Sequence, residues 1–277
     1  MGSPTKERIF FIALGVPVVI SLLAFFWIAA TLLTGVGSLN LDMLTTSVLK
    51  GGVFEMIVGT VYLFAGAAAI AGPIGVFAAI YLVEYAPSGK VTRIIDQAIN
   101  NLAGVPSIII GLFGYTFFSR QLGFGISLLS GWLTLSLMIL PIVIRGSEEA
   151  IRIVPTSFKQ AALALGATKW KSVSLTTLVA AAPGVVTSLI LGIARVAGET
   201  AAILFTSSVL ITRGLPSSPF EPVMTLSFNM YVKIVARGES PENVFGIALI
   251  LFFIVLSFSL VAIILRIYYR RKQPWLS

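Results

Sequence analysis

Residues 145–171 read RGSEEAIRIVPTSFKQAALALGATKWK, a charged stretch between two long apolar runs. Its ionisable side chains are Arg145, Glu148, Glu149, Arg152, Lys159, Lys169 and Lys171. The second half is rich in Ala and Leu, which favour helix, and is interrupted by Gly166. The pattern therefore predicts a short, charged, amphipathic helix between two membrane spans.

The composition of the chain indicates a protein that lies almost entirely in a lipid bilayer. Of 277 residues, 57% are hydrophobic and 11% are charged, and the mean hydropathy is +1.00. Soluble domains carry about 25% charged residues. The chain has no Cys and no His, which excludes disulfides, thiolate nucleophiles and imidazole chemistry. We expect one all-α polytopic membrane domain over residues 1–277, and not an enzyme.

Six segments are long enough to cross a bilayer, since a spanning helix needs about 20 mostly apolar residues. The first follows Lys6 and Arg8, but it is longer than the roughly 7–15 apolar residues of a signal peptide, so we predict a retained span. The predicted spans are Ile9–Leu33, Met56–Val83, Ile94–Phe118, Ile126–Ile144, Leu178–Val209 and Val244–Tyr268.

Basic residues are distributed unevenly between alternate loops. Because Lys and Arg are enriched in cytoplasmic loops, the distribution predicts that both termini and the loop at 145–177 are cytoplasmic. The same rule accounts for the net charge of +8 without a nucleic-acid partner. A multi-pass protein of the cell membrane is expected. The basic residues left on the outer side are Lys50, Arg120, Arg213, Lys233 and Arg237.

The chain lacks the motifs of nucleotide and metal sites. A phosphate-binding loop needs G-x-x-x-x-G-K-[ST], and the nearest match, at Ser88 to Lys90, has no upstream Gly. The carboxylates are too scattered for a calcium loop. We therefore expect no metal and no cofactor, and any ATP that drives this protein is expected to bind to another chain.

Two charged residues fall inside the fifth predicted span. Arg195 and Glu199 are flanked by apolar residues, and a charge at the bilayer centre costs about 2.5–3.5 kcal/mol. Their spacing predicts one helix face with the side chains one turn apart. The pair either ties helices together or handles an anion, with the hydroxyl of Thr200 nearby. Asn100 and Asn101, near the inner end of the third span, either join helices or line a path.

The charged stretch has the signals of a helix that docks on a partner. Pro155 favours a helix start, and Ser157 is the predicted N-cap of a helix that runs to Lys169. Small side chains on one face allow a helix to sit deep in a groove, and Gly166 permits a turn or a close approach. The small residues are Ala161, Ala162 and Ala167.

The pattern Gln160-Ala161-Ala162, then Gly166-Ala167, Trp170 and Pro183-Gly184, resembles the EAA loop of ABC-importer permeases. It departs at Gln160, where Glu is usual, and at Val179, where Pro is common. The resemblance implies the type I ABC importer permease fold and a coupling helix that docks on a separate ATPase. It also implies a set of ATPase-coupling residues, Ser157, Gln160, Ala161, Ala162, Gly166 and Ala167.

Two further stretches, NNLAGVPSIIIGLFG (100–114) and ARVAGETAAILFTS (194–207), are similar to the permeases of phosphate importers. A third, AAIYLVEYA (78–86), resembles the PstA-type subunit of the same group. That family implies a PstC-like permease partner, a PstB-like ATPase dimer, an extracytoplasmic phosphate-binding protein and inorganic phosphate as cargo. The resemblance places Arg195 and Glu199 on charged positions of the phosphate path. The other expected pathway residues are Thr200, Asn100 and Asn101.

Other functions remain open from the residues alone. An arginine binds sulfate or molybdate as readily as phosphate, so a permease for another oxyanion is an alternative. A carrier coupled to protons or sodium would use Arg195 and Glu199 as a relay, but the chain has no clear internal repeat, which such carriers often show. A non-transporting scaffold subunit would need no Arg195.

Overall fold

The computed structural model describes residues 4–38, 41–212, 214–238 and 244–272, and within these ranges the chain is almost entirely helical. Arg213, assigned above to the outer side, lies outside the described residues. The helices are α1 (Pro4–Thr34), α2 (Leu41–Thr45), α3 (Phe54–Ile80), α4 (Lys90–Ala103), α5 (Ser107–Gly114), α6 (Leu128–Ile153), α7 (Thr156–Ala164), α8 (Lys169–Ser172), α9 (Leu178–Ala197), α10 (Ala201–Thr206), α11 (Leu226–Tyr231) and α12 (Phe245–Lys272).

Short helical turns extend or connect several of these helices. Two 3₁₀ turns, η1 (Gly35–Ser38) and η2 (Val48–Lys50), lie between α1 and α3. The others are wider π turns that continue or precede a helix: η3 (Tyr81–Tyr85), η4 (Tyr115–Gln121), η5 (Val173–Thr177) and η6 (Val232–Ala236). In the described residues, pairing of the β type is limited to one isolated bridge between Ser208 and Val223.

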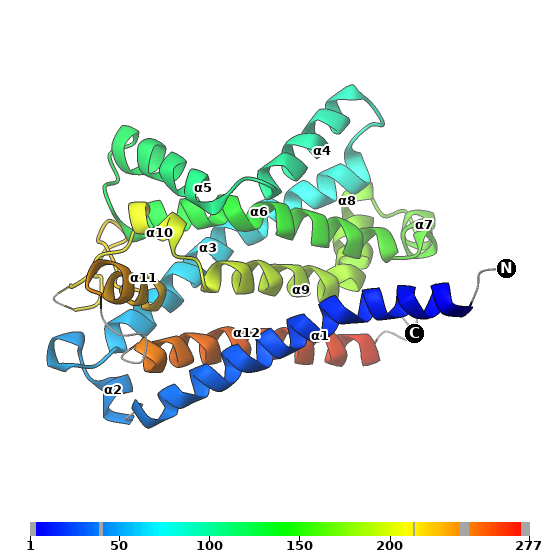
Figure 1. Cartoon of the computed structure of the whole chain (residues 1–277). Coiled ribbons are helices and arrows are strands. Elements are labelled where there is room, and N and C mark those ends of the chain that lie inside the picture. Colours follow the sequence, from blue (N-terminus) through cyan, green and yellow to red (C-terminus); the bar gives the residue numbers. More distant parts are fainter. Residues whose placement is uncertain (1–3, 39–40, 213, 239–243, 273–277) are drawn as a thin grey trace.

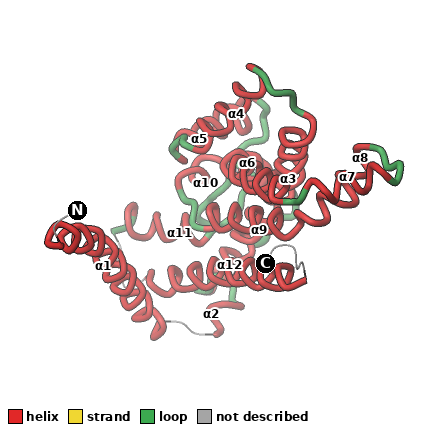
Figure 2. The backbone as a smooth tube through the Cα atoms, turned by 90° about the vertical axis from the view of Figure 1, so that its right-hand side faces the viewer, coloured by secondary structure: helices red, strands yellow, loops and turns green. Residues whose placement is uncertain are grey.

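The helices form an elongated bundle with two distinct ends. Figure 1 shows α3, α6 and α9 in the centre, α1 and α12 along one side, and the V-shaped pair α4 and α5 on the other. One end carries α7 and α8, together with the start of α1 and the end of α12; we call it the α7 end. The opposite end, with α2, α10 and α11, is the α11 end. In Figure 2, α7 and α8 project from the body of the bundle.

The core lies where α3, α6 and α9 pack against one another. Leu63 and Ala67 of α3 are buried against Ile139 of α6, in a cluster that also includes Val196 of α9. A Cβ on Gly66 would lie 2.1 Å from the indole of Trp132, whose Nε1 donates a 2.8 Å hydrogen bond to the carbonyl of Tyr62. Small residues thus let α3 approach α6 closely.

Five of the six predicted spans each correspond to one long apolar helix, whereas the third span is broken. Residues Lys90–Ala103 and Ser107–Gln121 form two helices bent by 102°. The prediction of a single helix over Ile94–Phe118 is therefore wrong. Pro106 lacks a backbone donor and keeps the preceding residue out of the helical region, so the chain turns after Ala103.

Two other spans have different bounds from those predicted. Helix α6 continues nine residues past Ile144 to Ile153, so the first half of the charged stretch is helical and is not part of a loop. The fifth span runs over Lys169–Ala197, not Leu178–Val209, because the helix stops at Gly198. The sidedness of the chain stays a prediction.

The connection between α10 and α11 is held by local hydrogen bonds. Glu221 accepts bonds from the backbone N–H (2.9 Å) and the hydroxyl (2.8 Å) of Ser217. These two bonds favour the ionised form and hold the pKa of Glu221 below its ordinary value. The backbone N–H of Leu128 donates to the carbonyl of Glu221, which fixes the start of α6 against this loop.

Candidate functional site

The turn between α9 and α10 positions Glu199. Helix α9 ends at Ala197, Gly198 follows, and the next helix begins at Ala201. Glu199 Oε1 accepts hydrogen bonds from the backbone N–H groups of Thr200, Ala201 and Ala202, at 3.2, 3.0 and 3.4 Å. A carboxylate here satisfies donors that have no partner within α10 and faces the positive end of its dipole. Glu199 therefore caps α10.

Arg195 and Glu199 do not form the helical pair expected from their spacing. The expectation assumed one continuous helix, but the break after Ala197 turns Glu199 toward α10. Arg195 lies in the last turn of α9 and is exposed, and it has no hydrogen-bond or ion-pair partner within the described part of the chain. Its guanidinium keeps its donors free, and these can bind an oxyanion.

The backbone of the same turn is anchored to α11. The hydroxyl of Ser227 donates a 2.9 Å hydrogen bond to the carbonyl of Glu199. Ser227 is buried, while Glu199 and Thr200 are half-buried. The position of Glu199 is therefore fixed by contacts at both its side chain and its backbone, with Arg195 free beside it. We call residues 198–200 the Glu199 turn.

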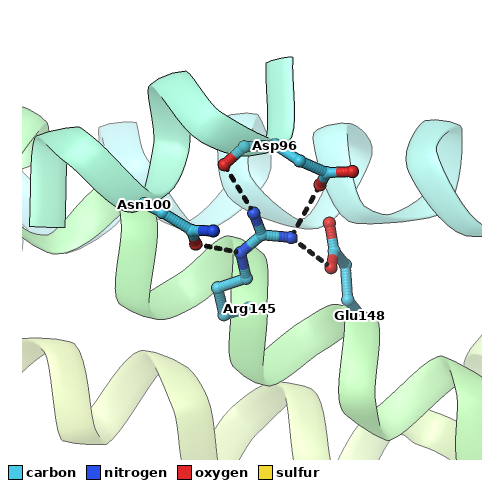
Figure 3. A network of polar contacts seen from close by, with 4 residues as sticks. All are labelled: Asp96, Asn100, Arg145 and Glu148. Atoms are coloured by element: carbon cyan, nitrogen blue, oxygen red, sulfur yellow. Dashed lines mark hydrogen bonds and ion pairs between the residues drawn. The ribbon is translucent and has the colours of Figure 1, made fainter. Parts of the chain in front are cut away.

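A second polar cluster joins α4 to α6, and Figure 3 shows its four side chains. Arg145 of α6 donates from Nη1 to Asp96 Oδ1 (2.9 Å) and to Glu148 Oε2 (2.8 Å). Its Nη2 donates to the backbone carbonyl of Asp96 (2.9 Å), and its Nε donates to Asn100 Oδ1 (3.1 Å). The acceptors on α4 hold the guanidinium in place, so this arginine fixes α4 to α6.

The two predicted asparagines thus have different environments. Both are exposed on α4, but Asn100 belongs to the Arg145 cluster and Asn101 does not. Asp96, Arg145 and Glu148 were not predicted as site residues. The three-residue spacing of Arg145 and Glu148 was visible in the charged stretch, but the contact with α4 spans 45 to 49 residues and leaves no local signal. In the described residues, Glu148 Oε1 is buried without a hydrogen-bond partner.

Arg145 and Arg195 lie at different levels of the bundle. Helices α6 and α9 run side by side in opposite directions, since a Cβ on Gly146 would meet Ser188 and one on Gly192 would meet Ile139. Extending this register puts Arg195 opposite residues near 137 of α6, about two helical turns from Arg145. Arg195 is therefore nearer the α11 end, and Arg145 nearer the α7 end.

The predicted docking segment consists of two helices and a turn. Helix α7 begins at Thr156 after Pro155, which makes no side-chain cap, so the prediction of Ser157 as N-cap is wrong. The helix ends before Lys169: Gly166 has φ +82°, its N–H bonds to the carbonyl of Leu163, and the N–H of Ala167 bonds to that of Ala162. This is a Schellman ending, which favours glycine.

Helix α7 exposes the residues that the sequence assigned to docking. Ser157, Gln160, Ala161 and Gly166 are exposed, and Ala162 and Ala167 are half-buried. Leu165, at the tip, is 90% exposed. A groove of about 550 Å³ lies instead between α6, α9 and α12 and contains none of the predicted pathway or docking residues.

The chain is similar to known membrane components of transporters. The family model for "binding-protein-dependent transport system inner membrane component" matches residues 71–273. A probable ABC transporter permease, YqgI of Bacillus subtilis, is 33% identical over 226 residues, or 76% of each chain. The phosphate transport system permease PstA 1 of Mycobacterium tuberculosis is 35% identical over 80% of this chain and 73% of its own. PstA of Haemophilus influenzae is 33% identical over 87% and 86%.

Solved structures support the fold. A chain of the methionine ABC transporter MetNI in an inward facing conformation has a TM-score of 0.60 at 19% identity, covering 78% of this chain and 97% of its own. A bacterial ABC transporter for the acidic polysaccharide alginate has a TM-score of 0.59 at 14% identity, covering 96% of both chains. The expected all-α importer permease fold is confirmed. The chain belongs to the family of inner membrane components of binding-protein-dependent transport systems.

Proposed function

We propose that this chain is the transmembrane permease subunit of an ATP-driven importer of inorganic phosphate. The identity of 33–35% to two PstA permeases over most of the chain supports the cargo class. One structural observation carries the proposal: Arg195 presents a free guanidinium at the end of α9, while the neighbouring carboxylate of Glu199 is engaged by α10. An oxyanion that reaches this turn meets an uncompensated positive charge.

The two arginines have different tasks in this proposal. Arg145 is engaged by Asp96, Asn100 and Glu148, so its charge is compensated and it serves to hold α4. Arg195 is exposed and is the stepping point for the anion, with Thr200 beside it. A permease has to release its cargo, and one exposed arginine in a solvated site binds weakly enough for that.

The remaining subunits follow from the same proposal. A second, PstC-like permease supplies the other half of the path, and an extracytoplasmic binding protein delivers phosphate. A PstB-like ATPase dimer docks on α7, where Leu165, Gln160 and Ala161 are exposed. Both termini and the α7 end are cytoplasmic, in keeping with the positive-inside rule. Closure of the ATPase dimer on ATP moves α7 as a lever, and the path opens outward to accept the anion.

Reconstitution of the complete complex tests the proposal. The permease, its partner permease and the ATPase are placed in proteoliposomes with the binding protein, and ATP-dependent uptake of labelled phosphate is measured. The R195Q variant is expected to lose uptake while the complex still assembles. R120Q, which neutralises an exposed arginine at the same end, serves as the control. Normal uptake in R195Q, or uptake of sulfate or molybdate in place of phosphate, would overturn the proposal.

A further inference from the structure

Helix α3 reaches both ends of the bundle. It runs from Phe54 to Ile80 and continues through η3 to Tyr85, a helical segment of 32 residues. At 1.5 Å per residue this is about 48 Å long. Figure 1 shows it crossing from the α11 end to the α7 end, and the helix continues on both sides of Pro73. Each of its ends makes a polar contact with a segment of the proposed mechanism.

At the α7 end, two lysines of the docking segment bind consecutive residues of η3. Lys159 of α7 forms an ion pair with Glu84, whose side chain is only 7% exposed. The ammonium of Lys169 lies 4.3 Å from the centre of the Tyr85 ring, within cation–π range. The hydroxyl of Ser172 donates a 3.1 Å bond to the carbonyl of Lys159, which ties α8 to α7.

Burial makes the contact between Lys159 and Glu84 difficult to break. If α7 moved away from α3, the carboxylate of Glu84 would remain in a poorly solvated place without its counter-charge. The apolar cluster of the α7 end, which contains Ala79 and Ile80 of α3 and Val173 of η5, packs the end of α3 against the turn that directly follows α8. The docking segment and the end of α3 are therefore expected to move together.

At the α11 end, α3 is attached to the segment that holds the Glu199 turn. The buried hydroxyl of Thr60 accepts a 3.1 Å hydrogen bond from the backbone N–H of Leu226. At the residue directly before Thr60, a Cβ on Gly59 would lie 2.2 Å from the carbonyl of Met224, so the two backbones are in direct contact. Ser227, the residue after Leu226, donates the bond to the carbonyl of Glu199.

We propose that α3 transmits the movement of α7 to the Glu199 turn, with the Glu84–Lys159 ion pair as its attachment at one end and the Thr60–Leu226 hydrogen bond at the other. Glu84, Lys159 and Thr60 are positioning residues, which act through Arg195 and Glu199 and do not touch the anion. This inference rests on the proposed function, since it assigns a route by which ATPase motion reaches the phosphate site.

A charge-swap cycle in the complete complex tests the attachment at the α7 end. Phosphate uptake and ATP hydrolysis are measured in the same proteoliposomes for E84K, K159E and the double variant E84K/K159E. Each single variant is expected to lower the phosphate transported per ATP by about tenfold, and the double variant to recover most of it. K90E, at an exposed lysine of the same end, is the control. Single variants that match K90E, or a double variant no better than the singles, would overturn the inference.

A chemical cross-link provides a second measurement that does not depend on how well the charge variants fold. Because the chain has no cysteine, E84C/K159C introduces the only two thiols of this subunit. Bridging them with a reducible bis-thiosulfonate reagent is expected to restore coupled transport, and reduction to abolish it again. A bridged complex that remains uncoupled would show that the two segments have to separate, contrary to the inference.

The attachment at the α11 end is tested with T60V, which removes the hydroxyl and keeps the shape. The phosphate-to-ATP ratio is expected to fall, while ATP hydrolysis continues. T116V removes an exposed hydroxyl that bonds only within its own helix and is the matched control. An unchanged ratio in T60V would remove this end of the proposed route. Phosphate uptake by the wild-type complex in the same experiment tests the proposed function separately: without it, that function fails, whatever the variants do.

Discussion

Arg145 and Asp96 are 49 residues apart in the sequence, and their side chains form a 2.9 Å ion pair that joins α6 to α4. Their contact is reinforced by the bond from Arg145 to the backbone carbonyl of Asp96. Helix α4 has no buried residue, so this polar contact contributes much of its attachment to the bundle.

Replacing Arg145 is therefore expected to release α4. R145A leaves Asp96 and the buried Glu148 without their counter-charge, and because Arg145 is one-third exposed we expect a loss of about 2–3 kcal/mol, below that of a fully buried pair. Hydrogen–deuterium exchange of α4 should rise in R145A and remain unchanged in R93Q, an exposed arginine of the same helix. Equal exchange in R145A and the wild type would contradict this role.

The cap at the start of α10 gives a prediction for Glu199. E199A removes the acceptor of three backbone N–H groups and is expected to destabilise the protein by about 1 kcal/mol. E199Q should be milder, because the amide oxygen still accepts. The measurement is thermal unfolding in detergent.

The absence of a direct pair with Arg195 is tested by a double-mutant cycle. With R195A and E199A, the coupling energy in the unfolding measurement is expected to stay below about 0.5 kcal/mol, as for residues that share no contact. A coupling well above about 1 kcal/mol would indicate that the two side chains do pair.

Gly166 is expected to be required for its backbone conformation, and not because its surroundings lack room for a side chain. Its φ of +82° is unfavourable for other residues, yet a Cβ there would meet nothing within 4 Å. G166A should therefore lower the stability of the Schellman ending of α7 by about 1 kcal/mol, and should weaken ATPase binding as a result. The bulkier G166W should uncouple the ATPase.

Binding of the purified ATPase to the permease in detergent measures this effect. Gly89 offers a control, since its φ of −173° suits any residue and a Cβ there also has open space. G89A should bind the ATPase like the wild type. Docking that is intact in both Gly166 variants would show that the α7 ending is not part of the interface.

At Gly66 the opposite holds, because the contact between α3 and α6 leaves no room for a side chain. A methyl group there overlaps the indole of Trp132, so G66A is expected to destabilise the bundle by about 1–3 kcal/mol. G15A, at a position on α1 with nothing within 4 Å, is the control. Thermal unfolding in detergent compares G66A with G15A. Equal midpoints for these variants would mean that α3 and α6 can move apart at little cost in free energy.

The sequence predicted what depends on local composition. Long apolar runs located α1, α3, α6 and α12, and the small residues before Gly166 located α7. Apolar content alone did not reveal where helices stop: Gly198 and Pro106 lie within runs that stay hydrophobic through the break. The break at Gly198 also explains why the spacing of Arg195 and Glu199 was misleading.

Tertiary contacts could not be predicted from the spacing of residues in the sequence. The α4 partners of Arg145, and the partner of Lys159, lie 45 to 75 residues away, on helices whose rotation about their own axes the sequence does not give. Glu84 sits in a stretch recognised only as a family resemblance, and its burial beside α7 became visible when the two segments were placed together. The guanidinium of Arg195 is likewise free because the break after Ala197 turns Glu199 away from it, toward α10.

The bend between α4 and α5 has a consequence for how the chain enters the membrane during synthesis. Helix α4 carries Arg93, Asp96, Gln97, Asn100 and Asn101, and such residues at the centre of a lone helix oppose insertion. The arginine that neutralises Asp96 is on α6, which leaves the ribosome later. We expect α4 to wait at the bilayer surface until α6 has crossed, so that the spans of this protein assemble out of their order in the chain.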